Sequence, residues 1–470
     1  MSSLVACPRG ILVDLGDVLL AWSANTSGAI SAQTLQRILS TSIWHSYERG
    51  EITREVCFKV ISDQFSLPVS EIAEAFSQAR KSLQPNNDLV SFIRNLKQDN
   101  SIKLYVMSNI GKEDFEDLRG DLQLQLFDRV FTSTAAGMRK PDPEFYRYVL
   151  DQVGLVGSQC LCIDDKEENI QAAQTLGIRG LVYGPSTLDA MRQIFESPVG
   201  KGWRYLFRNA QRYPSETHTG VTYDDNFANL LIRETVKDRS LMNLDWGSKK
   251  RWNFFAGKPV IVVGGQLPDD LETTSLALRV LGPSPNESVS SMLDTMLTYL
   301  NDDGTFLVYY DRDRPRVDLM CTTTVLTCFY IYGRGHELER TLQAVRSMLL
   351  ERSYLQGTRY YPSPDYCLGI IGSLVQSSDD SHLQAMLRPL LKLRVSERVG
   401  LGGSALDLAV RIITCRQMGV ECESDRRALL DLQCEDGRWE GGCIYLFLKT
   451  MIEITNVGVV TSKAIEALSC

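Results

Sequence analysis

Two patterns of apolar and polar residues divide this chain near residue 195. Before that point, short apolar runs at 10–13, 102–107 and 159–163 alternate with segments whose apolar residues recur at helical spacing. Such alternation is typical of a parallel β-sheet covered by helices. From Leu276 onward helical spacing dominates. It is seen over 290–300, 321–332, 337–351, 382–393 and 405–418. The pattern therefore predicts an α/β domain over 1–198 and an all-α domain over 199–470.

A region of helical patterns, at about 22–98, separates the first two apolar runs. Residues 33–44 and 53–65 both place apolar side chains at helical spacing. Asp14 and Ser108 lie too far apart along the chain (108 − 14 = 94 positions) for a simple loop to join them. The sequence therefore predicts a helical insertion after the first strand.

Composition and charge narrow the class of protein. The 470 residues carry 50 Lys and Arg against 58 Asp and Glu, a net charge of −8, and no basic patch indicates nucleic acid binding. No apolar run approaches the ~18 residues of a membrane span, and residues 1–14 lack the pattern of a signal peptide. The 12 cysteines show no zinc-binding spacing, so we expect them to be reduced and mostly buried. These features predict a cytoplasmic protein without stable membrane insertion, and they leave a homodimer open.

Polar residues follow each of the three apolar runs of the first domain, and a lysine comes between the second and the third. They are Asp14, then Ser108 and Asn109, then Lys140, then Asp164 and Asp165. Because ligands of parallel sheets bind at the carboxyl ends of the strands, we expect these side chains to meet there. Asp14 is placed as a nucleophile that takes a phosphoryl group. Ser108, Asn109 and Lys140 can hold phosphate oxygens, and the aspartates can bind Mg²⁺, which prefers oxygen ligands.

At these positions the segment 8–195 resembles the haloacid dehalogenase superfamily. A pair of aspartates after one strand is often only a turn, but the whole set in this order is specific. The helical insertion matches the cap of that family, and the stretch that begins at Trp44 resembles the cap of its epoxide hydrolase-associated phosphatases. The resemblance implies a Rossmann-like sheet and a Mg²⁺ site formed by Asp14, Asp164, Asp165 and the backbone carbonyl at Gly16.

Gly16 is a departure from that family, which has a second aspartate at this position. The missing carboxylate is the acid that protonates a leaving alkoxide. Asp17 lies one position further along and is expected to point the other way along a strand. A phosphate anhydride has a leaving group that needs little protonation. We therefore expect this domain to cleave a diphosphate readily and a monophosphate ester slowly.

The second domain carries an acidic motif, Asp270-Leu-Glu272-Thr273-Thr274, between a strand-like run at 259–263 and an apolar run that begins at Leu276. Burial and the charge of Asp270 are both expected to raise the pKa of Glu272, so that Glu272 keeps its proton. A carboxylic acid held in this way can protonate a carbon–carbon double bond. The alternative is a solvated turn in which Thr273 caps a helix.

A loop near the end of the chain, from Gln433 through Gly437 to Trp439, matches the QxxxGxW repeat of terpene cyclases. Its glycine is needed for a turn with positive φ and its tryptophan for packing between helices, which such repeats stack into an α/α barrel. The acidic motif resembles the DxDTT motif of class II terpene cyclases, with Glu272 in place of the aspartate that donates the proton. Over nearly the whole chain the sequence resembles the haloacid dehalogenase-like drimane sesquiterpene synthases, in which a phosphatase-like domain precedes one cyclase barrel.

That resemblance implies two reactions on farnesyl diphosphate. Glu272, next to Asp270, would protonate the terminal double bond and start cyclisation to a drimane-type diphosphate. The first domain would then remove phosphate to give the monophosphate or the alcohol. Candidates for the cyclase pocket, several of which are equally interpreted as core residues, are Thr273, Thr274, Tyr309, Tyr310, Phe329, Tyr360, Tyr366 and Trp439. Arg314, Arg316 and Arg359 are candidates for holding the diphosphate, and equally for surface charges.

Two other functions stay open. A small-molecule phosphatase with a helical interaction domain needs only the site around Asp14, and its activity would be indifferent to Glu272→Gln. A non-catalytic helical-repeat scaffold needs neither site, and both Asp14→Asn and Glu272→Gln would then be silent.

Overall fold

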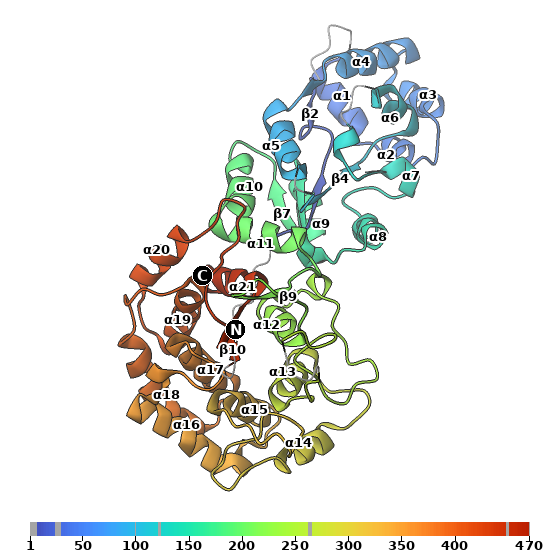
Figure 1. Cartoon of the computed structure of the whole chain (residues 1–470). Helices are drawn as coiled ribbons and strands as arrows, with labels where there is room; N and C mark the ends of the chain where they lie inside the picture. The colour runs from blue at the N-terminus through green and yellow to red at the C-terminus, as the bar shows by residue number, and fades with distance from the viewer. Residues whose placement is uncertain are drawn as a thin grey trace. The chain divides into compact units, whose positions relative to one another are not determined.

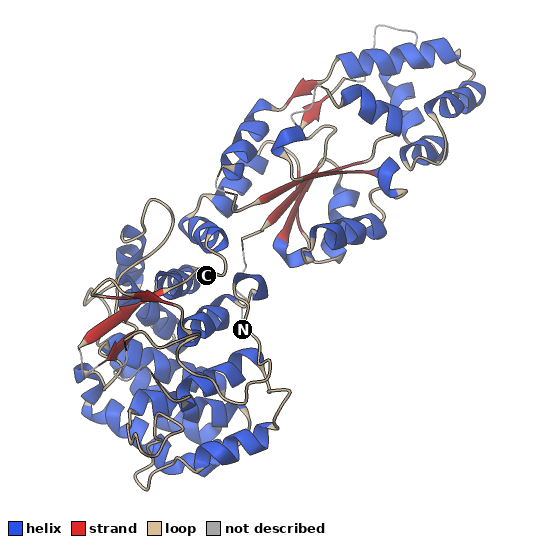
Figure 2. Cartoon of the chain, turned by 45° about the vertical axis from the view of Figure 1, so that its right-hand side comes forward, coloured by secondary structure: helices blue, strands red, loops and turns tan. Residues whose placement is uncertain are grey.

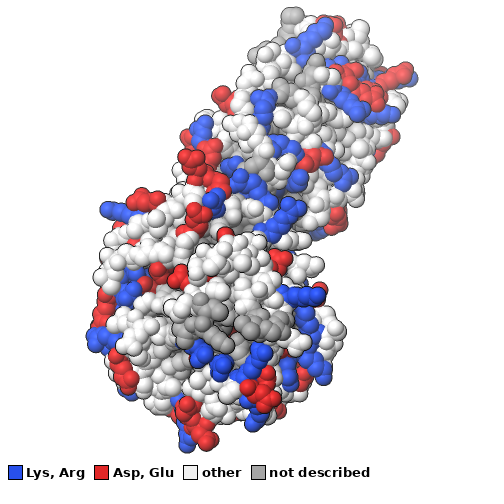
Figure 3. Space-filling view, in the orientation of Figure 1, with Lys and Arg blue, Asp and Glu red and all other residues white. Residues whose placement is uncertain are grey.

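A computed structural model describes residues 7–23, 30–98, 100–120, 124–261, 266–447 and 451–469. The chain forms two compact units, one that runs to Gly200 and one that begins at Lys201. Among the described residues, no helix has the length and apolar character needed to cross a membrane. Figure 3 shows acidic and basic side chains interspersed over the visible surface of each unit.

The first unit is built on a five-stranded sheet whose paired strands all run parallel, in the order β5-β4-β1-β6-β7. The strands are β1 (Gly10–Val13), β4 (Lys103–Ser108), β5 (Arg129–Thr132), β6 (Cys160–Asp164) and β7 (Arg179–Val182). The central strand β1 is aligned with both neighbours, since Val13 lies opposite Val106 and Ile163. Figure 2 shows these strands as red arrows with helices around them. The parallel sheet predicted from the apolar runs is therefore confirmed, and it places Asp14 at its centre.

Helices cover this sheet. The apolar residues of α8 (Pro143–Val153) and α9 (Glu167–Thr175) form one core with the side chains of β1, β4 and β6. This unit also contains α5 (Asn87–Lys97), α6 (Lys112–Leu118), α7 (Ser133–Ala136) and α10 (Thr187–Phe195).

The helical insertion forms a cap with its own core. Its helices are α1 (Ala32–Leu39), α2 (Ser42–Glu48), α3 (Arg54–Phe65) and α4 (Val69–Lys81). The pair β2 (Leu20–Ala21) and β3 (Gln84–Pro85) joins the two ends of the insertion as antiparallel strands. The segment 33–44, predicted as one helix, is two, because the Thr41 hydroxyl accepts from the Trp44 backbone N–H and begins a new helix there.

The second unit is a closed ring of six helices. They are α12 (Asn226–Val236), α13 (Leu271–Leu281), α15 (Leu319–Ile331), α17 (Pro364–Ser377), α19 (Ala405–Met418) and α21 (Val457–Leu468). Each packs against the next, and α21 packs against α12 (Figure 1). Outside this ring lie α14 (Val289–Leu297), α16 (Glu339–Glu351), α18 (Ser381–Ser396) and α20 (Glu423–Asp431). The predicted helical barrel is confirmed.

Further elements complete this unit. The helix α11 (Pro198–Arg208) precedes the ring. A four-stranded sheet has the order β10-β11-β8-β9 and consists of β8 (Ser215–Thr217), β9 (Thr222–Tyr223), β10 (Tyr445–Phe447) and β11 (Ile452–Thr455). The strand expected at 259–263 is not formed by residues 259–261, and its residues 262 and 263 lie outside the described part of the chain.

Candidate active sites

The carboxyl ends of β1, β4 and β6 bring the predicted phosphate site together. Asp14 follows β1, Ser108 ends β4 and Asp164 ends β6. Carboxylate oxygens of Asp14, Asp164 and Asp165 lie within 4.8 Å of one another. Ser108 and Asp165 line the same cavity as Asp14. The predicted residues therefore meet at one edge of the sheet, although they come from distant parts of the sequence.

Lys140 is the positive charge between these carboxylates. Its ammonium nitrogen lies 2.8 Å from Asp14 Oδ1 and 2.5 Å from Asp164 Oδ2. The Asn109 side chain holds the backbone of Lys140, because it accepts from the Lys140 N–H and donates to the Lys140 carbonyl, both at 2.8 Å. The contacts of Asn109 thus position Lys140, a role that the sequence did not indicate.

Burial and mutual repulsion perturb the carboxyl groups. Burial and the charge of Asp164 raise the pKa of Asp14, while Lys140 opposes this rise. Burial and the charges of Asp14 and Asp164 raise the pKa of Asp165 to about 6. A divalent cation among these oxygens would offset the repulsion, and oxygen ligands are those that Mg²⁺ prefers. The three aspartates therefore fit a magnesium site.

Gly16 leaves space beside this site. A Cβ at Gly16 would meet no described atom within 4 Å, so packing does not require a glycine there. Asp17 does not continue the strand as expected, because its φ is 56° and it lies in a turn. Its carboxylate accepts a hydrogen bond of 2.9 Å from the Trp22 indole. The Asp17 carboxylate, next to Gly16 in the chain, is thus held by Trp22 of the helical insertion.

The acidic motif of the second unit begins α13. Asp270 is the N-cap residue, since its Oδ1 accepts from the Thr273 N–H at 2.6 Å. Thr274 donates its hydroxyl to the Asp270 carbonyl and accepts from the Trp252 N–H. Asp270 and Glu272 are buried, 4% and 3% exposed. The alternative of a solvated turn capped by Thr273 is therefore wrong, because the cap is Asp270 and both carboxyl groups are shielded from water.

Glu272 is surrounded by neutral hydrogen-bond donors. Its Oε1 accepts from the Tyr361 hydroxyl at 2.6 Å and from the Thr324 hydroxyl at 3.0 Å. Burial raises the pKa of Glu272 to about 7, although hydrogen bonds from Cys321, Tyr361 and Thr324 lower it. Burial also raises the pKa of Asp270 to about 8. Glu272 is therefore predominantly protonated below pH 7.

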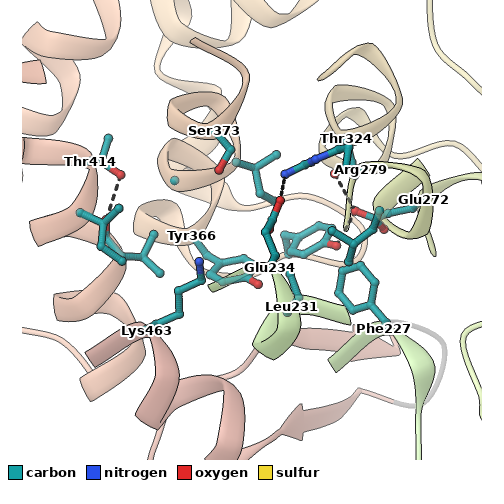
Figure 4. A pocket seen from close by; sticks show the side chains of 16 residues that line it. Phe227, Leu231, Glu234, Glu272, Arg279, Thr324, Tyr366, Ser373, Thr414 and Lys463 are labelled. Carbon is teal, nitrogen blue, oxygen red and sulfur yellow. Dashed lines mark hydrogen bonds and ion pairs between the residues drawn. The ribbon is translucent and has the colours of Figure 1, made fainter. Parts of the chain in front are cut away.

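A cavity in the ring of helices has Glu272 on its wall, and all six inner helices contribute to its lining. The cavity is narrow, with about 60 Å³ open to the centre of a water-sized molecule. Figure 4 shows Glu272 and Thr324 on one side of it and Lys463 and Thr414 on the other.

Arg279 is a charged residue that lines this cavity and lies on the same helix as Glu272. Arg279 lies seven residues after Glu272 on α13, which is about 10 Å along the helix axis. It pairs with Glu234, while its buried Nε has no partner among the described residues. Arg279, Lys463 and Tyr361 were not among the site residues predicted from the sequence. For Arg279 a signal existed, because it is the one cation in the segment 271–281 that carries the acidic motif, and it lies two helical turns after Glu272.

Of the predicted aromatic residues, Tyr366 lines this cavity. Tyr309 and Tyr360 belong to a neighbouring cluster, where Tyr360 stacks on Tyr445 with ring centroids 4.8 Å apart. The other predicted side chains, Thr273, Thr274, Tyr310, Phe329 and Trp439, are also absent from the lining. Arg314, Arg316 and Arg359 are not part of it either, and Arg316 is exposed. The periodicity did not separate residues that face the centre of the ring from residues that pack elsewhere.

The QxxxGxW loop has the structural role that its sequence predicted. Gly437 has a φ of 94°, and a Cβ there would come within 2.4 Å of the Lys201 carbonyl oxygen. Trp439 is fully buried, and its indole donates to the Leu429 carbonyl at 2.8 Å. The Gln433 side chain donates to the Gly437 carbonyl of the same loop at 2.9 Å.

Known proteins resemble both units. Residues 8–177 match the haloacid dehalogenase-like hydrolase family, and residues 199–332 match the sesquiterpene cyclase astC-like C-terminal domain. Drimenol cyclase drtB of Aspergillus calidoustus is 38% identical over 467 residues, which cover 98% of this chain and 88% of the relative. This chain belongs to the drtB family of sesquiterpene cyclases. The family predicted from the two sets of motifs is thereby confirmed.

Other relatives match the first unit alone. Sesquiterpene phosphatase astK of Aspergillus oryzae is 37% identical over 174 residues, 37% of this chain and 88% of that protein. A haloacid dehalogenase family enzyme of Bacteroides thetaiotaomicron, solved as a magnesium complex, aligns with 40% of this chain and 99% of its own at 20% identity and a TM-score of 0.34. The order of a haloacid dehalogenase-like domain followed by a helical cyclase-type domain agrees with the fold that the sequence predicted.

Proposed function

We propose that this enzyme cyclises farnesyl diphosphate to a drimane-type diphosphate and then removes phosphate from the product. In this proposal residues 199–470 carry the cyclase and residues 1–198 the phosphatase. The observation that carries it is Glu272, a buried carboxylic acid on the wall of a cavity within a ring of helices. The similarity to a drimenol cyclase and to a sesquiterpene phosphatase supports the pairing of the two reactions.

The contacts of Glu272 suit an acid that must protonate a double bond. Both hydroxyl donors reach Oε1, so Oε1 acts as the carbonyl oxygen of the acid and the proton resides on Oε2. When Oε2 transfers its proton to the terminal double bond, Tyr361 and Thr324 continue to donate to Oε1 and stabilise the new carboxylate. The internal double bonds then attack the carbocation in turn, and the bicyclic cation loses a proton.

The walls of the cavity suit a cation that must avoid water. Leu231, Leu276 and Ile413 contribute apolar surface, which excludes water from the intermediate. Phe227, Tyr361 and Tyr366 add aromatic rings, whose faces stabilise positive charge. The diphosphate is at the opposite end of the substrate from the protonated bond. We propose that Arg279 and Lys463, rather than the predicted arginines at 314, 316 and 359, hold it, because they are on the wall of the same cavity.

In the first domain Asp14 would take the terminal phosphoryl group. Lys140, which stays charged because Asp14 and Asp164 raise its pKa despite its burial, would orient Asp14 and contact the phosphate oxygens. Bound Mg²⁺, held by Asp14, Asp164, Asp165 and the carbonyl at Gly16, would supply charge neutralisation for the phosphoryl oxygens. Since Gly16 offers no acid, we expect the cyclic monophosphate to accumulate before any alcohol forms.

The wild type, Glu272→Gln and Asp14→Asn are each incubated with farnesyl diphosphate and Mg²⁺ to test this function. Glu272→Gln keeps the size of the side chain but removes the acidic proton, so we expect cyclisation to fall by about 10²- to 10⁴-fold. Asp14→Asn should still cyclise and should accumulate the cyclic diphosphate. Mass spectrometry and phosphorus NMR identify the products. Cyclic product from Glu272→Gln at the wild-type rate would exclude Glu272 as the acid. Phosphate release by the wild type without any cyclic product would favour a phosphatase with a helical interaction domain.

A further inference from the structure

The cavity that contains Asp14 continues beneath the cap, where further basic side chains line it. His45 comes from α2 of the cap, Arg139 directly precedes Lys140, and Lys166 precedes α9. None of these three side chains forms a described ion pair with the aspartates as Lys140 does, although the Lys166 backbone N–H donates to Asp164 Oδ1 at 3.0 Å. The Trp44-His45 stretch singled out in the sequence has no part in the chemistry at Asp14.

Arg139 is held in a fixed position by the cap. Its Nε donates to Glu48 Oε2 at 2.9 Å, and Glu48 Oε1 accepts from the Trp44 indole at 3.1 Å. Glu48 and Arg139 are largely buried, with side chains 11% and 18% exposed. Within the described parts of the chain, the two terminal nitrogens of the Arg139 guanidinium make no hydrogen bond. They remain available to an oxygen-rich ligand in the cavity.

The charges around His45 indicate an excess of positive potential at this place. Burial lowers the pKa of His45, and the nearby charges of Arg139, Arg49 and Lys166 lower it further. Acidic side chains also line this cavity, and Glu48 offsets part of the Arg139 charge through their ion pair. Asp114 is paired with Arg54 and Arg80. Asp17 accepts from the Trp22 indole, and Glu168 is exposed. An anion bound here would be attracted by the cations and could accept a hydrogen bond from the imidazole.

We propose that His45, Arg139 and Lys166 form a second phosphate position, which binds the phosphate that stays on the organic group while Asp14 attacks the terminal one. The inference rests on the proposed phosphatase function and specifies its substrate as an organic diphosphate. A monophosphate ester has only an alkyl group to place in this position. The charges here and the missing acid at Gly16 therefore favour the same substrate.

The reaction balances without an added acid. The Asp14 carboxylate forms a bond to the terminal phosphorus, and the bond from that phosphorus to the bridging oxygen breaks. The electron pair goes to the bridging oxygen, which leaves as a phosphate monoester anion beside Arg139 and Lys166. Water then cleaves the aspartyl phosphate, which releases inorganic phosphate, regenerates the Asp14 carboxylate and gives a proton to the solvent.

The test compares two substrates on the full chain with Glu272→Gln, so that cyclisation does not precede dephosphorylation. Phosphate release is measured from farnesyl diphosphate and from p-nitrophenyl phosphate, each with Mg²⁺. Arg139→Gln should lower the ratio of kcat/KM for the diphosphate to that for the monoester by about 10- to 100-fold, as expected for a lost charged hydrogen bond. Lys166→Gln, at an exposed position, should lower the same ratio with little risk to folding.

Arg49→Gln is the matched control, because Arg49 lies near His45 but pairs with Glu51 and does not line the cavity. It should leave the ratio unchanged. A second readout is calorimetric binding of inorganic pyrophosphate, which should weaken in Arg139→Gln and Lys166→Gln and not in Arg49→Gln.

Equal losses on both substrates would overturn the second phosphate position, since Arg139 and Lys166 would then only support Asp14. An unchanged ratio in both variants would overturn it as well. If phosphate release persists in Asp14→Asn, the proposed phosphatase function itself fails, and that outcome is separate from a change in the ratio.

Discussion

The two units surround carboxyl groups in opposite ways. Asp14 is in direct contact with an ammonium group, 2.8 Å from Lys140, and lies among further carboxylates that suit a metal ion. Glu272 accepts hydrogen bonds from neutral hydroxyl groups and lies on the wall of a cavity lined by apolar, aromatic and some charged side chains. Burial raises the pKa of both carboxyl groups. At Asp14 the charge of Lys140 opposes this rise and stabilises the carboxylate that a nucleophile needs, whereas at Glu272 hydrogen bonds from neutral groups oppose it and the acid form prevails below pH 7. The chemistry of each carboxyl group follows from what surrounds it.

The largest effect is expected when the cation next to Asp14 is removed. Lys140→Gln should lower phosphate release by about 10²- to 10³-fold, because the buried carboxylates lose their positive partner and the phosphate loses a donor. Cyclisation should remain, and the cyclic diphosphate should accumulate. Product analysis by mass spectrometry checks both the loss of phosphate release and the retention of cyclisation. A parallel loss of cyclisation would contradict the independence of the two sites.

The second largest effect is expected from a change of pH, which should alter the cyclisation rate through Glu272. Because the pKa of Glu272 is raised to about 7, its acid form predominates below pH 7 and is lost above it. The single-turnover rate of cyclisation should be flat at low pH and fall about tenfold per unit well above pH 7. The measurement uses rapid quench with Asp14→Asn, so that dephosphorylation does not interfere. A rate that rises with pH would exclude Glu272 as the acid.

A gain of function should come from Gly16→Asp. The space beside Gly16 accepts a side chain, and the new carboxyl group could protonate a leaving alkoxide. We expect hydrolysis of farnesyl monophosphate to rise by about tenfold or more, with hydrolysis of the diphosphate little changed. Gly16→Asn, of similar size but without an acidic proton, is the control. An equal gain with asparagine would mean that the missing acid does not limit the reaction.

The smallest expected effect concerns the hydroxyl that touches Glu272. Tyr361→Phe removes a hydrogen bond of 2.6 Å that stabilises the carboxylate. Glu272 should then become a weaker acid by about 1 kcal/mol, which lowers the cyclisation rate about fivefold and moves the pH profile upward. Tyr366→Phe removes a hydroxyl from the same cavity without removing a described hydrogen bond to Glu272. The upward shift should occur in Tyr361→Phe alone.

The local sequence pattern predicted the residues of the phosphate site around Asp14 well, and those of the cavity around Glu272 only in part. Asp14, Ser108 and Asp164 could be found because each ends an apolar run, and parallel strands place those ends at one edge of a sheet. The helices of the ring are apolar on most sides, so their spacing does not tell which side faces the centre. Phe329 on α15 is buried but absent from the cavity lining, whereas Arg279 lines it.

The sequence by itself determined the order of the domains, the phosphate site at the sheet edge, the missing acid at Gly16 and the acidic pair at Asp270 and Glu272. These depend on strand ends, turn glycines and short motifs, which are local properties of the chain. The tertiary structure alone decided which groups touch Glu272, which cations share its cavity, and that Asn109 holds Lys140. Those contacts join residues from separate elements, such as Glu272 and Tyr361, and packing, not local sequence, brings them together.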